Sequence, residues 1–289
     1  MKARMRIENA LEAALERTSG AGAPPRLAAA MRHALFPPGA RLRPRLCLAV
    51  AAACGEDQPG LTDAAAAAIE MLHGASLVHD DLPCFDDAPL RRGKPTIHVT
   101  FGEPLAVLAG DALIVLAFET LALAAGAAPD RLAALVTTVS GSVGMPGGIA
   151  AGQAWESEPA TPLADYERAK TGALFAGASM AGAAAAGVEP EPWRLLGERL
   201  GEAYQVVDDI RDVTARPDEV GKPTGRDQTL GRPNAALQLG LPGALERLET
   251  LLASMIDSIP RCPGAPDLEA LLRAEALRFL PKELAKRAA

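Results

Sequence analysis

The sequence predicts an all-α protein. The prediction rests on its amino-acid composition and on the positions of its glycine and proline residues. Of its 289 residues, 49% are hydrophobic but only 3% are aromatic, and stretches rich in alanine and leucine recur along the chain. Alanine and leucine favour helices, whereas a β-sheet would use more valine, isoleucine and aromatic residues. No linker, charge block or internal repeat divides the chain, so we expect one large helical domain over residues 1–289.

Helices are expected wherever an apolar pattern runs between glycine and proline breaks. The predicted segments are 2–19, 25–36, 40–54, 62–82, 104–125, 130–143, 163–187, 191–214, 234–240, 243–258 and 266–287. Two longer irregular stretches remain, 83–103 and 215–233, and each follows an aspartate cluster and carries Arg or Lys beside Gly. Long ordered loops of this kind are often functional lids.

Charge and composition exclude several classes of protein. A formal net charge of -7 gives no basic field for nucleic acid or anionic lipid. The apolar stretch from Leu105 to Ala128 carries Asp111 and Glu119, which a membrane span would bury at high cost, so we expect a buried helix and no integral membrane segment. No signal peptide or close cysteine pair is present, and we expect a cytoplasmic protein.

One aspartate cluster lies in the predicted helix 191–214. The polar residues that fall within one arc of roughly 100° on that helix are Gln205, Asp208, Asp209 and Asp212. Valine and isoleucine flank them, so the helix is expected to be mostly buried, where unpaired carboxylates are costly. A metal site explains this pattern, and a solvated acidic face is the alternative.

The other aspartate cluster, Asp80, Asp81 and Asp86, stands where a predicted helix meets Pro83. Pro83 should end the helix and let Asp86 fold back. His73 precedes Asp80 by two turns on the same face, roughly 10 Å away by helical rise. The alternatives are a series of turn aspartates and a histidine satisfied within the helix bundle.

Both clusters together indicate magnesium and phosphate. Magnesium usually takes only one or two protein carboxylates, and substrate phosphate oxygens complete its octahedron. Cations beside flexible backbone suit phosphate oxygens, although each such segment is also common on a solvated surface. The segments are Arg91-Arg92-Gly93-Lys94, Lys170-Thr171-Gly172, Gly221-Lys222-Pro223 and Gly225-Arg226-Asp227.

In this order and spacing, the motifs resemble those of the trans-isoprenyl diphosphate synthases, the polyprenyl synthetase family of all-α homodimers, over residues 37–234. The family's DDxxxxD motif followed by RRG is met by Asp80, Asp81, Asp86, Arg91, Arg92 and Gly93. Its Gln before DDxxD is met by Gln205, Asp208, Asp209 and Asp212. The KTG element matches Lys170, Thr171 and Gly172, the homoallylic-site histidine matches His73, and the GKxxGKD loop matches Lys222, with Arg226 replacing its second lysine.

The resemblance implies a role for each of these residues. Three magnesium ions that grip an allylic diphosphate would be held by Asp80, Asp81, Asp86, Asp208, Asp209 and Asp212. Arg91, Lys170 and Lys222 would hold the allylic diphosphate, and Arg41, His73 and Arg92 would hold isopentenyl diphosphate. Thr171, Gln205 and Arg226 complete the substrate-binding set, and the residues expected to be catalytic are Asp80, Asp81, Lys170 and Asp208.

The implied reaction is a head-to-tail condensation. Metals and cations stabilise the departing diphosphate, the double bond of isopentenyl diphosphate attacks the allylic cation, and the leaving diphosphate accepts the proton. The product is an allylic diphosphate five carbons longer.

Three departures from the family pattern stand out. The lysine of the family's GGKR motif is replaced by Ala40, and Ala88 and Pro89 replace acidic residues that usually follow the first motif. Glu156 stands where the family's GQxxD pattern usually has its aspartate.

Product length is implied by the residues five and four positions before Asp80, which are Ala75 and Ser76. In the family, a bulky aromatic residue there stops growth at fifteen carbons, so two small residues resemble the bacterial geranylgeranyl type. Leu72, Leu108 or Phe118 could instead close the pocket lower down, and fifteen or twenty-five carbons are the alternatives.

Two other functions are the alternatives, and each can be distinguished from a prenyl synthase. A terpene cyclase would normally lack the second DDxxD motif, which Asp208, Asp209 and Asp212 provide here. A partner subunit that has lost its chemistry is suggested by Ala40, and activity of the purified chain would distinguish it from an enzyme.

Overall fold

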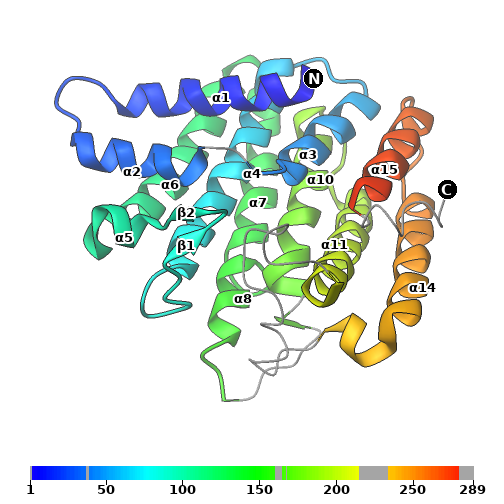
Figure 1. The fold of residues 1–289 in the computed structure, drawn as a ribbon. Helices are drawn as coiled ribbons and strands as arrows, with labels where there is room; N and C mark the ends of the chain where they lie inside the picture. The colour runs from blue at the N-terminus through cyan, green and yellow to red at the C-terminus, as the bar shows by residue number, and fades with distance from the viewer. Residues whose placement is uncertain (1, 37–38, 160–164, 167, 215–233, 280–289) are drawn as a thin grey trace.

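The computed structural model describes residues 2–36, 39–159, 165–166, 168–214 and 234–279, and the predicted all-α class is confirmed. Figure 1 shows helices packed around a central α4, with the C-terminal α14 and α15 along one edge. The N-terminal half contains α1 (Lys2–Thr18), α2 (Pro25–Leu35), α3 (Leu42–Ala53), α4 (Pro59–Asp80), α5 (Ile97–Phe101) and α6 (Glu103–Ala124).

The second half continues the bundle. Its α-helices are α7 (Leu132–Val143), α8 (Ile149–Trp155), α10 (Ala173–Ala185), α11 (Arg194–Thr214), α14 (Ala235–Asp257) and α15 (Ala265–Phe279). The short turns are η1 (Ala125–Ala127), η2 (Pro129–Arg131), the π-helical η3 (Arg168–Gly172) and η4 (Glu191–Trp193). The segments predicted at 234–240 and 243–258 form one helix, α14, which is kinked at Gly240 with φ 69°.

The core is built on small side chains. Helix α10 is buried from Leu174 through Ala185, and it packs against α3 and α11. At Gly182 the backbone of α10 approaches the Cys47 carbonyl of α3 so closely that a Cβ would clash with it. Alanine and glycine therefore allow close helix packing with few aromatic residues.

Three short elements within the described residues were not predicted. Residues 83–103 were expected to be irregular, but they contain α5 and an antiparallel hairpin of β1 (Leu90–Arg91) and β2 (Lys94–Pro95). Residues 149–155 form α8. Such short elements are stabilised by tertiary contacts more than by local propensity.

Helix α6 differs from the expectation of a fully buried helix. It lies in the one segment of the described chain, Glu103–Ala127, that is long and apolar enough to cross a membrane, and only 44% of its most apolar stretch is buried. Leu108, Val115 and Leu123 are each at least half exposed. One face of α6 is therefore apolar and uncovered in the monomer.

Candidate active site

Asp80 and Asp81 lie at the C-terminal end of α4, and both are buried, with exposed fractions of 8% and 4%. Beyond Pro83 the chain folds back on this end, because the Asp86 N–H donates to the Asp80 carbonyl at 2.9 Å. The first aspartate cluster is thus fixed on a buried helix end, as the sequence predicted.

A cationic side chain and an amide side chain from two other elements reach these aspartates. Arg91, on the hairpin, donates from Nε to Asp81 at 2.8 Å, and its Nη2 lies 2.6 Å from the same carboxylate. Gln153 of α8 donates to Asp80 Oδ1 at 2.9 Å and to the Ser76 carbonyl at 3.1 Å. The hairpin therefore supplies a partner for Asp81, and α8 supplies one for Asp80.

The electrostatics at this end of α4 favour a bound cation. Burial raises the pKa of Asp80, and neither Lys170 nor the Gln153 hydrogen bond fully offsets it. Burial likewise raises the pKa of Asp81 despite its pair with Arg91, and Asp86 raises the pKa of both carboxyls further. A nearby metal ion would stabilise the ionised form of both carboxylates.

Lys170 belongs to the π-helical turn η3, which packs between α8 and α11. A Cβ at Gly152 of α8 would lie 2.6 Å from the Lys170 Cα, so this close approach requires glycine. Burial lowers the pKa of Lys170, but Asp80 and a hydrogen bond to Glu156 outweigh it and leave the pKa above its ordinary value. Thr171 donates to Gln205 of α11 at 3.3 Å, so η3 joins the α4 end to the second cluster's helix.

A second group of cations surrounds His73. Arg43 Nη1 lies 3.5 Å from His73 Nε2, and the Arg43 guanidinium stacks 4.3 Å from the centre of the Phe175 ring. Burial and the neighbouring arginines, Arg43 first and then Arg92, hold the pKa of His73 well below its ordinary value. Burial also lowers the pKa of Arg43 and Arg92. Two guanidinium groups and a neutral imidazole in one place suit a diphosphate.

Arg41 has a different environment from the one predicted. Its guanidinium donates to Glu70 at 2.6 Å, to Glu8 at 3.1 Å and to the Leu35 carbonyl at 2.8 Å, and only 3% of the residue is exposed. These partners occupy the guanidinium, so Arg41 ties α1, α2 and α4 together. The residue that sequence reasoning missed is Arg43, whose buried Nε has no hydrogen-bond partner among the described residues.

The hairpin turn places Arg92 beside Gly39. Arg92 and Gly93 both have positive φ, 52° and 76°, which gives the tight turn between β1 and β2. A Cβ at position 39 would lie 2.6 Å from the Arg92 guanidinium carbon. Glycine at 39 therefore leaves room for Arg92 in the cation group, while Ala40 beside it is exposed.

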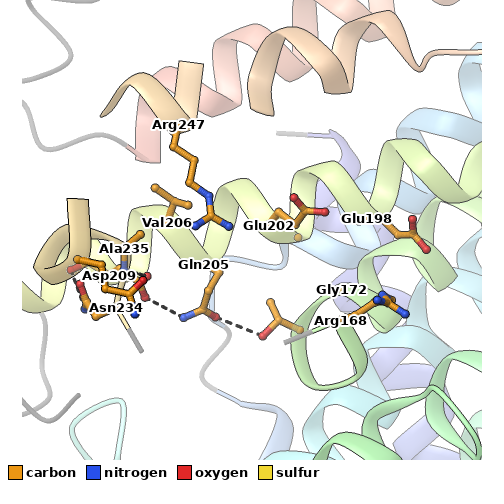
Figure 2. Close-up of a pocket in the computed structure, with 13 residues that line it drawn as sticks. Arg168, Gly172, Glu198, Glu202, Gln205, Val206, Asp209, Asn234, Ala235 and Arg247 are labelled. Carbon is orange, nitrogen blue, oxygen red and sulfur yellow. Dashed lines mark hydrogen bonds between the residues drawn. The ribbon is translucent and has the colours of Figure 1, made fainter. Parts of the chain in front are cut away.

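The aspartates of the second cluster have different environments. Asp208 is partly exposed, whereas Asp209 and Asp212 are buried, at 5% and 9% exposure. Asp209 accepts from Gln205 Nε2 at 2.9 Å and from the Ala235 backbone N–H at 2.8 Å. Residues of α11, α14 and η3 line a cavity of about 340 Å³. Figure 2 shows Gln205 and Asp209 among the residues that line it. The predicted binding residues Lys222 and Arg226 lie outside the described residues.

The residues expected to set product length lie one turn before the first cluster. Ala75 is buried, with 1% exposure, and forms part of the core. Ser76 is partly exposed; its hydroxyl donates to the His73 carbonyl at 2.9 Å, and its own carbonyl accepts from Gln153. Both small residues are therefore next to the metal-ligating candidates.

Comparisons with known proteins agree with this geometry. The polyprenyl synthetase family matches residues 24–263. The chain belongs to the polyprenyl synthetase family. It is 54% identical over 282 residues to the geranylgeranyl diphosphate synthase of Cereibacter sphaeroides, with 98% of each chain covered. It is accordingly a prenyltransferase.

Solved structures of relatives share the fold. An apo FPP/GFPP synthase from Zymomonas mobilis has a TM-score of 0.79 at 29% identity, covering 95% of this chain and 97% of its own. A geranyltransferase from Helicobacter pylori, complexed with magnesium and isoprenyl diphosphate, has a TM-score of 0.77 at 30% identity, covering 96% and 97%.

The donor set of this polyprenyl synthetase fits the family's magnesium. Within the described part of the chain, no three His, Cys, Asp or Glu side chains lie close enough to hold a metal by themselves. Paired, buried carboxylates such as Asp80 and Asp81 match an ion that takes few protein ligands and completes its shell with phosphate oxygens. Gln153 is the glutamine of the GQxxD pattern that ends at Glu156, but its contact with Asp80 depends on where α8 packs and could not be read from the pattern.

Proposed function

We propose that this polyprenyl synthetase condenses isopentenyl diphosphate with an allylic diphosphate and that its main product is geranylgeranyl diphosphate. The observation that carries the proposal is the pairing of two sites along α4. Asp80 and Asp81 form a carboxylate site lined by Arg91 and Lys170, and two turns earlier His73 lies in a cationic site with Arg43 and Arg92. Two diphosphates, one carried by metal and one by cations, suit this arrangement.

Magnesium would be held by the carboxylates of both clusters, with three ions when substrate is bound. We assign Asp80, Asp81 and Asp86 from the first cluster and Asp208 and Asp212 from the second. When bound, the ions would neutralise the charge that develops on the departing diphosphate. Arg91 and Lys170 approach from the hairpin and from η3 and would add charge-assisted hydrogen bonds to the same group. Lys222, Thr171, Gln205 and Arg226 complete the proposed binding set.

Isopentenyl diphosphate would bind in the cationic group. We place Arg43 there in the position first expected for Arg41, because Arg41 is committed to Glu8 and Glu70. His73 is held neutral by its surroundings and can donate one hydrogen bond to a phosphate oxygen without adding charge. Arg43 and Arg92 supply the charge that Ala40 does not, which favours an active enzyme over a partner subunit.

The product length follows from the small residues at the first cluster. Ala75 and Ser76 are both small and precede Asp80 by about one turn of α4, and the relative from Cereibacter sphaeroides is named a geranylgeranyl diphosphate synthase. Farnesyl diphosphate is the alternative product, because an aromatic residue at another level of the pocket would stop growth earlier.

We further propose that the chain forms one domain over residues 1–289, acts as a homodimer and is cytoplasmic. The uncovered apolar face of α6, with Leu108, Val115 and Leu123, supports the dimer because monomeric proteins rarely expose contiguous apolar surface of this kind. Analytical ultracentrifugation of the purified protein would test it. A monomer at micromolar concentration would contradict it.

The reaction is tested by incubating purified protein with magnesium, isopentenyl diphosphate and, in turn, dimethylallyl, geranyl and farnesyl diphosphate. Dephosphorylated products are then separated by chromatography. We expect geranylgeraniol as the dominant alcohol. Farnesol would retain the condensation but overturn the product length, whereas no elongation with any starter would favour the partner-subunit alternative.

A further inference from the structure

The carboxylate of Asp209 is used to hold the start of α14. Its Oδ2 accepts from the Ala235 backbone N–H at 2.8 Å, and its Oδ1 accepts from Gln205 Nε2 at 2.9 Å. The first N–H groups of a helix have no partner within the helix and must be satisfied from outside. Asp209 supplies one of these partners, and its negative charge also suits the positive end of the helix dipole.

Asn234 completes the same junction from the other side. Its side-chain oxygen accepts from the Leu237 N–H at 3.0 Å, which makes it the N-cap of α14. Its amide donates to the Asp209 backbone carbonyl at 3.3 Å, and only 1% of Asn234 is exposed. Helices α11 and α14 are thus joined by side-chain and backbone groups of one aspartate.

The junction also extends to η3, where Lys170 lies. Thr171 donates to Gln205 Oε1. Gln205 in turn donates to Asp209, as Figure 2 shows. The segment 235–239 is separated from the rest of α14 by the kink at Gly240. Its position therefore depends on contacts with α11 more than on continuity with the later turns of α14.

Asp208 and Asp209 differ in what their carboxylates face. Adjacent helical residues point about 100° apart, so both cannot address the same point. Asp209 is turned toward α14 and buried, whereas Asp208 is partly exposed. Each carboxylate oxygen of Asp209 already accepts a hydrogen bond, from Ala235 or from Gln205, so the fold sets the orientation of this side chain.

We propose that Asp209 is a positioning residue that fixes the start of α14 and η3 to α11, and that the metal ligands of this cluster are Asp208 and Asp212 without Asp209. The second half rests on the proposed function, but the first does not. Reading all aspartates of the motif as equivalent ligands would miss this division.

Hydrogen exchange of the metal-free protein tests the positioning role without any activity. In Asp209→Ala, the amides of residues 235 to 237 should exchange about 10-fold or more faster than in the wild type, because local opening is easier when caps are lost. Asn234→Ala should accelerate the same amides. The matched control, Asp208→Ala, should leave them unchanged.

Binding of inorganic diphosphate as a function of magnesium concentration separates the two aspartates further. Asp208→Ala should raise the magnesium concentration needed by about 10-fold or more, and Asp209→Asn, which keeps one acceptor oxygen, by less than about 3-fold. The opposite result would overturn the proposal: unchanged exchange at 235–237 in Asp209→Ala, or a magnesium defect in Asp209→Asn equal to that of Asp208→Ala. If wild type binds no diphosphate with magnesium, the metal assignment of Asp208 fails, whereas the exchange result still decides the role of Asp209.

Discussion

The two aspartate clusters look alike in the sequence, but the structure supports them by different means. At the end of α4, Asp80 and Asp81 are compensated by side chains, chiefly Lys170 and Arg91, and burial still raises the pKa of both carboxyls. On α11, Asp209 is compensated by a helix N-terminus and an amide. The first cluster is therefore held ready for a cation, whereas part of the second belongs to the fold.

The difference shows that a carboxylate motif in the sequence does not by itself determine which of its aspartates bind metal and which support the fold. The role depends on which groups the rest of the chain brings to each oxygen. The four predictions below test the contrast, beginning with the largest expected effect.

Asp81→Ala should have the largest effect on activity. Removing the carboxylate deprives Arg91 of its partner and the metal of a proposed ligand, so turnover should fall by about 10³-fold or more. Far-UV circular dichroism should stay unchanged, because α4 is held by its apolar faces. Near-normal turnover would remove Asp81 from the metal site and break the contrast between the clusters.

Arg41 and Arg43, which lie close in the sequence but have different partners, give the next prediction. Arg43→Ala should raise the KM for isopentenyl diphosphate by about 10- to 100-fold while the protein remains folded. Arg41→Ala should instead lower the free energy of unfolding by about 3–5 kcal/mol, because Glu70 would be left buried without its partner. Steady-state kinetics and urea unfolding measure the two effects. Interchanged results would restore Arg41 as the binding residue.

These two arginines show where sequence reasoning reaches its limit. Arg41 adopts a left-handed conformation, with φ 54°, just before α3 begins, and this turns it toward Glu8 and Glu70. Neither the conformation nor those distant partners can be deduced from the segment Arg41-Leu42-Arg43. Asp209 is a similar case, because its role depends on Ala235, which lies beyond the end of its own helix.

The helices themselves were predictable because alanine- and leucine-rich runs end at glycine and proline. Helix α4 ends at Asp80, close to the predicted end at residue 82, and the hairpin that follows was missed. That hairpin depends on contacts such as the Thr96 hydroxyl, which donates to the Ala88 carbonyl at 2.7 Å. Local propensity predicts long helices well, but it does not encode such contacts.

Variants of the residues that precede each cluster test whether the elongation pocket lies beside the first cluster alone. Ser76→Phe and Ala75→Phe should shift the main product from twenty to fifteen carbons, because each places a ring one turn before Asp80. Ser76 is the safer site, since Ala75 is fully buried and a ring there also strains the core. Chromatography of the dephosphorylated products measures the shift.

The matched control is Tyr204, which precedes Asp208 by the same number of residues. Its ring packs against Phe175 at 5.6 Å between centroids, so Tyr204→Leu should leave product length unchanged. A longer product from Tyr204→Leu, or an unchanged product from both phenylalanine variants, would place the pocket elsewhere.

The smallest expected effect is on stability, and its sign should differ between the clusters. Burial raises the pKa of Asp80, so the folded protein binds this proton more tightly than the unfolded chain does. The ionised carboxylate therefore costs stability as the pH rises from the ordinary range toward and above the raised pKa. Asp80→Asn removes that cost and should raise the melting temperature of the metal-free protein at neutral pH, with roughly 2–4 °C for each kcal/mol gained.

The gain from Asp80→Asn should shrink as the pH is lowered toward the ordinary range of an aspartate, because the wild-type carboxyl then takes up its proton. Asp209→Asn should instead lower the melting temperature, since Asn cannot accept from both Gln205 and Ala235 as the carboxylate does. Thermal unfolding of both variants across this pH range measures the contrast. If Asp80→Asn melted below the wild type at neutral pH, the hydrogen bond from Gln153 and the positive charge of Lys170 would outweigh the burial of Asp80. The first cluster would then stabilise the fold as the second does.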